Sequence, residues 1–104
     1  MENILEVDGT KIMLQESDFP KELNFININK EIEKIGGGWR LPTKIELNEI
    51  FLNKKLIKGI NKFDTYWSCE EENDYAWVQN MWKGNFDTLN KKEYKCLIRL
   101  VKTI

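Results

Sequence analysis

The first apolar residues along the chain predict a β-hairpin. Two apolar-rich segments, 5–7 and 11–14, flank the dipeptide Asp8-Gly9. Asp-Gly between two such segments favours a tight turn, because both central positions of that turn take positive φ values. We therefore expect a short antiparallel pair of strands near the N-terminus.

The next apolar residues recur with the period of a helix. Phe25, Ile28, Ile32 and Ile35 lie three or four positions apart, which places them on one helix face. Three glycines follow at 36–38, and glycine readily takes the left-handed conformation that ends a helix. The pattern predicts a helix that ends at the glycines.

A second helix is expected at about 44–53. Thr43 is placed to cap its first turn, and Glu46 follows three positions later, which is the spacing of a capping box. The apolar face of this helix is expected to comprise Leu47, Ile50 and Phe51.

The rest of the chain predicts a loop followed by strands. Residues 56–64 are expected to form the loop, and residues 70–74 a polar loop between strands. The strands are expected at 65–69, 75–82, 86–89 and 94–102, the last as a central strand covered on both faces. A hairpin, two helices and then strands indicate one α+β domain spanning residues 1–104, not a parallel doubly wound sheet.

Charge and hydropathy narrow the choice of partner. The 104 residues include 16 basic and 17 acidic side chains, a net charge of −1, which does not favour nucleic-acid binding. The basic cluster Lys54, Lys55, Lys58 and Lys62 is typical of a solvated helix end and loop. No basic leader and no apolar run of about 20 residues is present, so a cytoplasmic location without a membrane partner is expected.

The residue types present argue against several kinds of catalysis. The chain has no histidine, which excludes a Ser-His-Asp or Cys-His apparatus and a histidine-containing zinc site. Cys69 and Cys96 do not form a CxxC pair, and we expect both to be reduced thiols. The acidic run 70–74 is interpreted as a solvated loop, with calcium binding as the alternative. We expect no enzyme activity, no cofactor and no metal.

Four separated blocks of the sequence resemble a known family. They are Gly37-Gly38-Trp39-Arg40-Leu41-Pro42-Thr43 with Glu46-Leu47, Tyr66-Trp67-Ser68 with Glu71, Ala76-Trp77 with Gly84-Asn85, and Ile98-Arg99-Leu100-Val101-Lys102. Together they resemble the Lcl C-terminal-domain-like family, named after a domain of a bacterial collagen-like adhesin.

The resemblance implies a C-type-lectin-like fold, with two helices packed on small antiparallel sheets, and a bacterial module without catalytic residues. The adhesin's domain is associated with sulfated glycosaminoglycans. Cys69, Glu70, Gln79, Trp82 and Lys102 depart from the family pattern.

Most residues in these blocks are expected to build the scaffold. The set comprises Trp39, Arg40, Leu41, Pro42, Thr43, Glu46, Trp67, Trp77, Gly84 and Arg99. Arg40 and Arg99 are expected to form ion pairs or to bond backbone carbonyls, since a planar guanidinium suits such fixed contacts. Trp67 and Trp77 are expected in the core.

Trp82 is the residue most favoured for contacting a partner. Strand alternation places it opposite Trp77 and Met81, and the Lys83-Gly84 turn beside it makes burial difficult. Simple packing against a neighbouring loop is the interpretation that the sequence favours over such a contact for Trp82 itself. Lys83, Tyr75 and Tyr94 complete the predicted contact set.

These features predict a small binding module whose partner is a protein. The contacts are expected to come from the loops at 56–64, 70–74 and 82–85, since binding residues concentrate on loops held by a rigid scaffold. Two alternatives remain: a glycan-binding domain of the adhesin type, and an inhibitor or adaptor encoded by a phage or mobile element that acts on a host protein.

Overall fold

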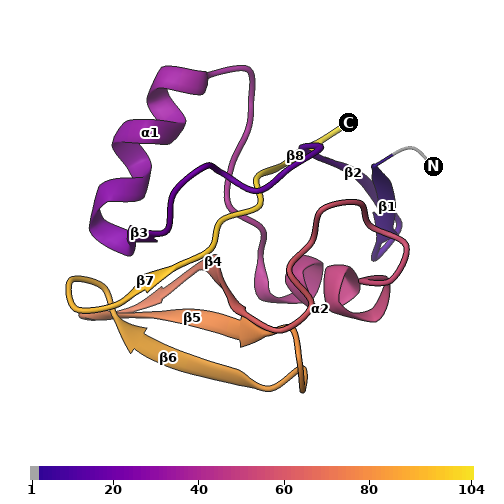
Figure 1. The fold of residues 1–104 in the computed structure, drawn as a ribbon. Helices are drawn as coiled ribbons and strands as arrows, with labels where there is room; N and C mark the ends of the chain where they lie inside the picture. Colours follow the sequence, from indigo (N-terminus) through magenta and orange to yellow (C-terminus); the bar gives the residue numbers. More distant parts are fainter. Residues whose placement is uncertain (1–2) are drawn as a thin grey trace.

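The computed structural model describes residues 3–104, which form two α-helices, a 3₁₀ turn and three small antiparallel sheets (Figure 1). The helical elements are η1 (Phe25–Asn27), α1 (Ile28–Ile35) and α2 (Lys44–Leu52), and the strands are β1 (Ile4–Val7), β2 (Thr10–Leu14), β3 (Leu23–Asn24), β4 (Thr65–Glu72), β5 (Tyr75–Asn80), β6 (Phe86–Asn90), β7 (Lys95–Cys96) and β8 (Val101–Thr103). The predicted α+β class is confirmed. None of the helices within the described residues is long and apolar enough to span a bilayer.

The predicted N-terminal hairpin is present. Strands β1 and β2 pair antiparallel around a two-residue turn in which Asp8 and Gly9 have φ values of 49° and 78°. The last strand, β8, pairs with the other edge of β2, so that Ile12 faces Thr103. The C-terminus therefore lies beside the hairpin, as Figure 1 shows.

The helix predicted before the three glycines is also present, with a tighter first turn. η1 leads directly into α1, and Gly36 ends the helix with a φ of 64° and a hydrogen bond from its N–H to the carbonyl of Ile32. Ile28 is buried whereas Ile35 is 39% exposed, so the core covers only the N-terminal part of the expected apolar face.

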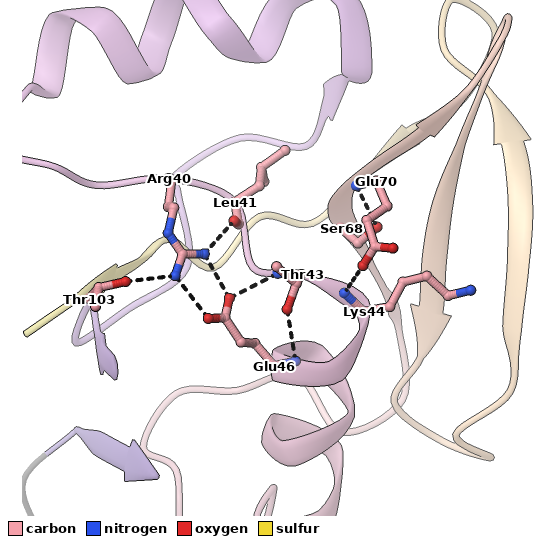
Figure 2. Close-up of polar contacts among 8 residues, drawn as sticks. All are labelled: Arg40, Leu41, Thr43, Lys44, Glu46, Ser68, Glu70 and Thr103. Atoms are coloured by element: carbon pink, nitrogen blue, oxygen red, sulfur yellow. Dashed lines mark hydrogen bonds and ion pairs between the residues drawn. The ribbon is translucent and has the colours of Figure 1, made fainter. Parts of the chain in front are cut away.

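Helix α2 begins with the predicted capping box. The backbone N–H of Glu46 donates to Thr43 Oγ1 at 3.2 Å, and the Glu46 carboxylate accepts from the backbone N–H of Thr43 at 2.9 Å (Figure 2). The backbone N–H of Lys44 donates to the Glu70 carboxylate at 2.6 Å. These bonds satisfy N–H groups that the first helical turn leaves without intrahelical partners.

Arg40 connects this cap to the last strand. Its two terminal nitrogens donate to the two carboxylate oxygens of Glu46 at 2.7 and 2.8 Å, and one of them also donates to Thr103 Oγ1 at 3.0 Å (Figure 2). A bidentate pair of this kind fixes orientation as well as distance. The expected scaffold role of Arg40 is confirmed.

The expected loop at 70–74 is mostly strand. β4 continues through Glu71 and Glu72, which pair with Ala76 and Tyr75, and only Asn73 and Asp74 form the turn. Asn73 has a φ of 56°, which asparagine tolerates better than most residues. Backbone pairing with β5 extended the strand through residues whose charge indicated a loop.

The predicted core position of Trp77 is wrong, whereas that of Trp67 is confirmed. Trp67 is fully buried and faces Val78 across the ladder, so Val78 and Ala76 share its face and are buried with it. Trp77 therefore lies on the opposite face, half-buried, with Lys44 Nζ 3.6 Å from its ring centroid. The register with β4, which includes a bulge, decides this face.

The expected single strand at 94–102 is wrong as well. β7 pairs with β3, β8 pairs with β2, and the segment between them changes from one sheet to the other. Ile98 and Leu100 are buried within this segment. Arg99, which stands between them in the sequence, also has a fully buried side chain. The apolar run reflects burial at a crossing between sheets, not a strand covered on both faces.

Two apolar clusters make up the core. One joins the β1-β2-β8 sheet to α2 and contains Ile12, Leu47 and Ile50. The other lies between Phe25 and the β4-β5-β6 sheet and contains Trp67 together with Leu41. Among the predicted core and turn residues, Leu41 and Pro42 are buried and Trp39 is half-buried.

Candidate functional site

Four exposed apolar side chains come from the end of α2, the segment 53–64 and the β5–β6 turn. They are Leu52, Leu56, Phe63 and Trp82, with exposed fractions of 64%, 64%, 67% and 57%. We call these four residues the Trp82 surface. The rings of Phe63 and Trp82 lie against each other, with centroids 5.0 Å apart and planes inclined by 32°. An exposed aromatic pair in mutual contact marks an interaction site more often than scattered exposed apolar residues do.

The turn that carries Trp82 is held by one asparagine. Asn80 Oδ1 accepts the backbone N–H groups of Trp82 at 2.8 Å and Lys83 at 3.1 Å, and its carbonyl accepts the N–H of Gly84 at 2.8 Å. Gly84 has a φ of 82°, and a Cβ at this position would lie 2.5 Å from the Phe51 ring. The turn is therefore seated directly on helix α2, as only glycine allows.

Gln79 supports the same turn from inside the protein. Its side chain is fully buried, and Nε2 donates to Asn48 Oδ1 at 2.8 Å and to the carbonyl of Gly84 at 3.0 Å. Gln79 and Trp82 both depart from the pattern of the family that the sequence resembles. In the structure Gln79 is a residue of β5 whose side chain bonds the turn that carries Trp82.

The loop that carries Phe63 is held from the opposite side. The backbone N–H of Phe63 donates to Asn61 Oδ1 at 2.9 Å, and the N–H of Asn61 donates to the Tyr66 hydroxyl at 2.8 Å. Tyr66 in turn donates to Asp18 Oδ2 at 2.6 Å. Burial, together with this hydrogen bond, raises the pKa of Tyr66 well above its ordinary value, so the hydroxyl stays a donor at neutral pH.

Arg99 completes this internal support and has the predicted scaffold role. Its side chain is fully buried, and Nε donates to Asp18 Oδ1 at 2.8 Å. Another nitrogen donates to the carbonyls of Gln15 at 3.0 Å and Lys58 at 3.3 Å. Arg99 thus ties the middle of the 53–64 segment to the chain that follows the N-terminal hairpin.

Lys54 joins the two parts of the surface. Its Nζ donates to the carbonyl of Met81 at 2.5 Å and approaches that of Trp82 at 3.4 Å, while lying 4.8 Å from the Phe51 ring centroid. The backbone N–H of Met81 donates to the carbonyl of Asp64 at 2.9 Å. The loop and the turn are therefore bonded to each other, which holds the backbones of Phe63 and Trp82 side by side.

A hollow lies at the end of α2. Its volume is about 480 Å³, and it is lined by Phe51, Leu52, Asn53, Lys54, Lys55 and Leu56. Lys54 extends from it to the carbonyls of Met81 and Trp82. The hollow and the turn that carries Trp82 are thus connected through Lys54.

The structure divides the predicted contact residues into two groups. Trp82 and Lys83 lie in the β5–β6 turn, since β5 ends at Asn80 and not at residue 82 as expected. Trp82 is 57% exposed and its ring packs against Phe63 of the 56–64 loop, which is the loop packing that the sequence favoured. Tyr75 and Tyr94 are 47% and 49% exposed, but Tyr75 is the first residue of β5 and Tyr94 lies in the β6–β7 connection. That connection lies at the same end of β5, away from the Trp82 turn (Figure 1), and the six residues of β5 span about 17 Å.

Sequence reasoning named none of the other three members of the surface individually, although it placed Leu56 and Phe63 in the contact loop expected at 56–64. Leu52 lies outside the apolar face predicted for the second helix, and Leu56 and Phe63 fall in a loop where no periodicity applies. One signal was available for Phe63. It has Lys62 and Asp64 as neighbours, and such an isolated aromatic residue in a polar loop is difficult to bury.

The two thiols lack the properties of a reactive nucleophile. Both cysteines are free, and burial raises the pKa of Cys69 and raises that of Cys96 to about 12. The thiolate is the reactive form, so both groups are protonated and unreactive at neutral pH. Among residues 3–104, no three acidic or cysteine side chains gather as the ligands of a metal ion would.

The chain matches no protein-family model and no curated protein. The fold and the surface define it as a small α+β domain with a preorganised exposed aromatic pair. Membership of the Lcl C-terminal-domain-like family stays a prediction from the four sequence blocks.

Proposed function

We propose that this protein is a non-enzymatic binding module that contacts a protein partner through the Trp82 surface. The observation that carries the proposal is the Phe63–Trp82 pair. The two rings are in contact, each side chain is more than half exposed, and the two residues come from separate segments that are bonded to each other. Tryptophan and other aromatic side chains are enriched among the residues that dominate protein interfaces.

Rigidity of the surface supports this proposal. A partner that binds flexible loops loses free energy in ordering them, whereas a surface fixed beforehand avoids that cost. Asn80, Lys54 and the Arg99–Asp18 pair hold the turn and the loop without any partner present. Burying one large apolar side chain in an interface contributes about 1.5–3 kcal/mol, so these four residues supply a sufficient anchor.

We include in the proposal a C-type-lectin-like arrangement of the domain. Its support is the resemblance of the four sequence blocks, the order of the elements, and the pairing of β2 with β8 that brings the two ends of the chain together. In this arrangement the connecting segments carry recognition and the sheets carry stability.

The test is quantitative binding by surface variants. A partner captured from native lysate is identified, purified and titrated against the wild-type protein, Phe63→Ala and Trp82→Ala. Each variant is expected to raise the Kd at least about tenfold, as removal of an aromatic side chain from the centre of an interface does. Tyr75→Ala is the matched control, because Tyr75 is similarly exposed at the other end of β5, and it should leave the Kd unchanged.

The same variants need a stability control. Phe63 and Trp82 lie outside the two core clusters, so each truncation is expected to change the free energy of unfolding by less than about 1 kcal/mol. Urea denaturation followed by circular dichroism measures this. If the purified partner binds Trp82→Ala and the wild-type protein equally well, the surface has no part in recognition.

A further inference from the structure

We infer that the part of the partner seated on the Trp82 surface is an acidic protein segment that carries one or two large apolar side chains; this rests on the function proposed above. The segments 50–63 and 80–86, which carry the surface, contain five lysines and no aspartate or glutamate, although Glu49, Asp64 and Asp87 flank them directly. Those lysines are Lys54, Lys55, Lys58, Lys62 and Lys83.

The rest of the molecule has the opposite charge. Without these five lysines the chain has 11 basic and 17 acidic residues, a net charge of −6, although the whole chain is nearly neutral at −1. The near-neutral total therefore hides a strong separation of charge between the segments of the Trp82 surface and the remainder.

Four of the lysines are available to a partner. Lys55, Lys58, Lys62 and Lys83 are exposed, and none of their ammonium groups forms an ion pair within residues 3–104. The fifth, Lys54, donates to backbone carbonyls and serves the surface internally. Positive groups around an apolar centre favour a partner with carboxylates around an apolar anchor, because complementary charges speed encounter and select the partner.

The charge distribution also disfavours other occupants. A second copy of the same surface would bring two sets of unpaired lysines together, and like charges repel. A long polyanion or a flat anionic membrane would extend beyond the surface and meet a remainder of net charge −6. A short acidic segment needs only the local surface, and the hollow of about 480 Å³ has room for its apolar side chain.

In the experiment, a display library of random 12-residue peptides is selected for binding to the purified wild-type protein and, in parallel, to the Trp82→Ala variant. Peptides enriched at least tenfold on the wild-type protein relative to Trp82→Ala are expected to have a negative net charge and at least one large apolar residue. Replacing the acidic residues of a selected synthetic peptide by amides should weaken its binding about tenfold, and raising NaCl from 50 to 500 mM should weaken the unmodified peptide by a similar factor.

A charge reversal provides the matched variant. Lys62→Glu with Lys83→Glu should weaken the selected peptide at least tenfold, whereas Lys21→Glu with Lys30→Glu, which changes two exposed lysines outside the surface segments, should change its binding less than twofold.

The outcomes separate this inference from the proposed function. If no peptide depends on Trp82, the proposed function itself fails. If peptides depend on Trp82 but are neutral or basic, only the acidic partner is overturned. Tighter Trp82-dependent binding to a heparin oligosaccharide, to single-stranded DNA or to phosphatidylserine vesicles, or dimer formation lost in Trp82→Ala, would also overturn it and would identify the other occupant.

Discussion

At the scale of single residues, the Trp82 surface depends on a few side chains that are themselves hardly exposed. Asn80 holds the backbone of the turn, and Gly84 allows that turn to approach the Phe51 ring. Neither residue has the chemistry of a recognition group. These positions fix the backbone from which the Trp82 side chain extends toward Phe63.

Replacing Gly84 by alanine tests this approach. The variant adds a Cβ that would lie 2.5 Å from the Phe51 ring, at a φ of 82° that alanine adopts at a cost. We expect the free energy of unfolding to fall by about 2–4 kcal/mol, from backbone strain together with overpacking.

Gly9→Ala is the control for this variant, since Gly9 has a similar φ of 78° and open space where its Cβ would lie. The free energy of unfolding of this variant is expected to fall by about 1 kcal/mol, from backbone strain alone. Equal losses in the two variants, measured by urea denaturation, would show that the contact with Phe51 has no energetic effect.

At the scale of elements, the junction between α2 and β8 rests on the Arg40–Glu46 pair. Burial of Glu46 opposes ionisation, but hydrogen bonds from Arg40 and Thr43 outweigh it and lower the pKa of this carboxyl below its ordinary value of 4.5. Because the pKa is lowered on folding, the ionised carboxylate contributes stability above pH 4.5, and that contribution is lost as pH falls through the folded-state value.

The expected result is a pH-dependent difference between the wild-type protein and Glu46→Gln. At pH 7 the variant should be less stable by about 1 kcal/mol, since the pair is only partly buried. Below pH 4 the difference should shrink toward zero, because the wild-type carboxyl becomes protonated as well. Urea denaturation at several pH values measures it, and a difference that stays constant down to pH 3 would contradict the assignment.

At the scale of the whole molecule, the Arg99–Asp18–Tyr66 network connects segments that are far apart in the sequence. Arg99 contacts the carbonyls of Gln15 and Lys58, and Tyr66 bonds both Asp18 and the backbone of Asn61. The loop that carries Phe63 is thereby fixed to the region after the N-terminal hairpin. We expect that loosening this network affects the Trp82 surface without any change at the surface itself.

Tyr66→Phe is the mildest way to loosen it. The variant keeps the buried ring, removes the donor to Asp18 and leaves the N–H of Asn61 without its acceptor. Stability is expected to fall by about 1–3 kcal/mol. Native-state hydrogen exchange should become at least about tenfold faster in residues 58–63, beyond the change in global unfolding, while the β1–β2 hairpin shows only the global effect.

Local features of this protein could be read from the sequence, and the assembly of its sheets could not. The turn at Asp8-Gly9 and the cap at Thr43 depend on residues within four positions of one another, so their local patterns were sufficient. The division of 94–102 between two sheets and the orientation of Trp77 depend on partners far away in the sequence.

The candidate site shows the same division. The sequence alone indicated that Trp82 is difficult to bury, since it stands beside a glycine turn at the end of a strand. Only the tertiary structure decided that Phe63, 19 positions earlier, lies against it and that Lys54 bonds the turn that carries it. The physical reason is that a surface forms where separate segments are brought together, and no local pattern records which segments those are.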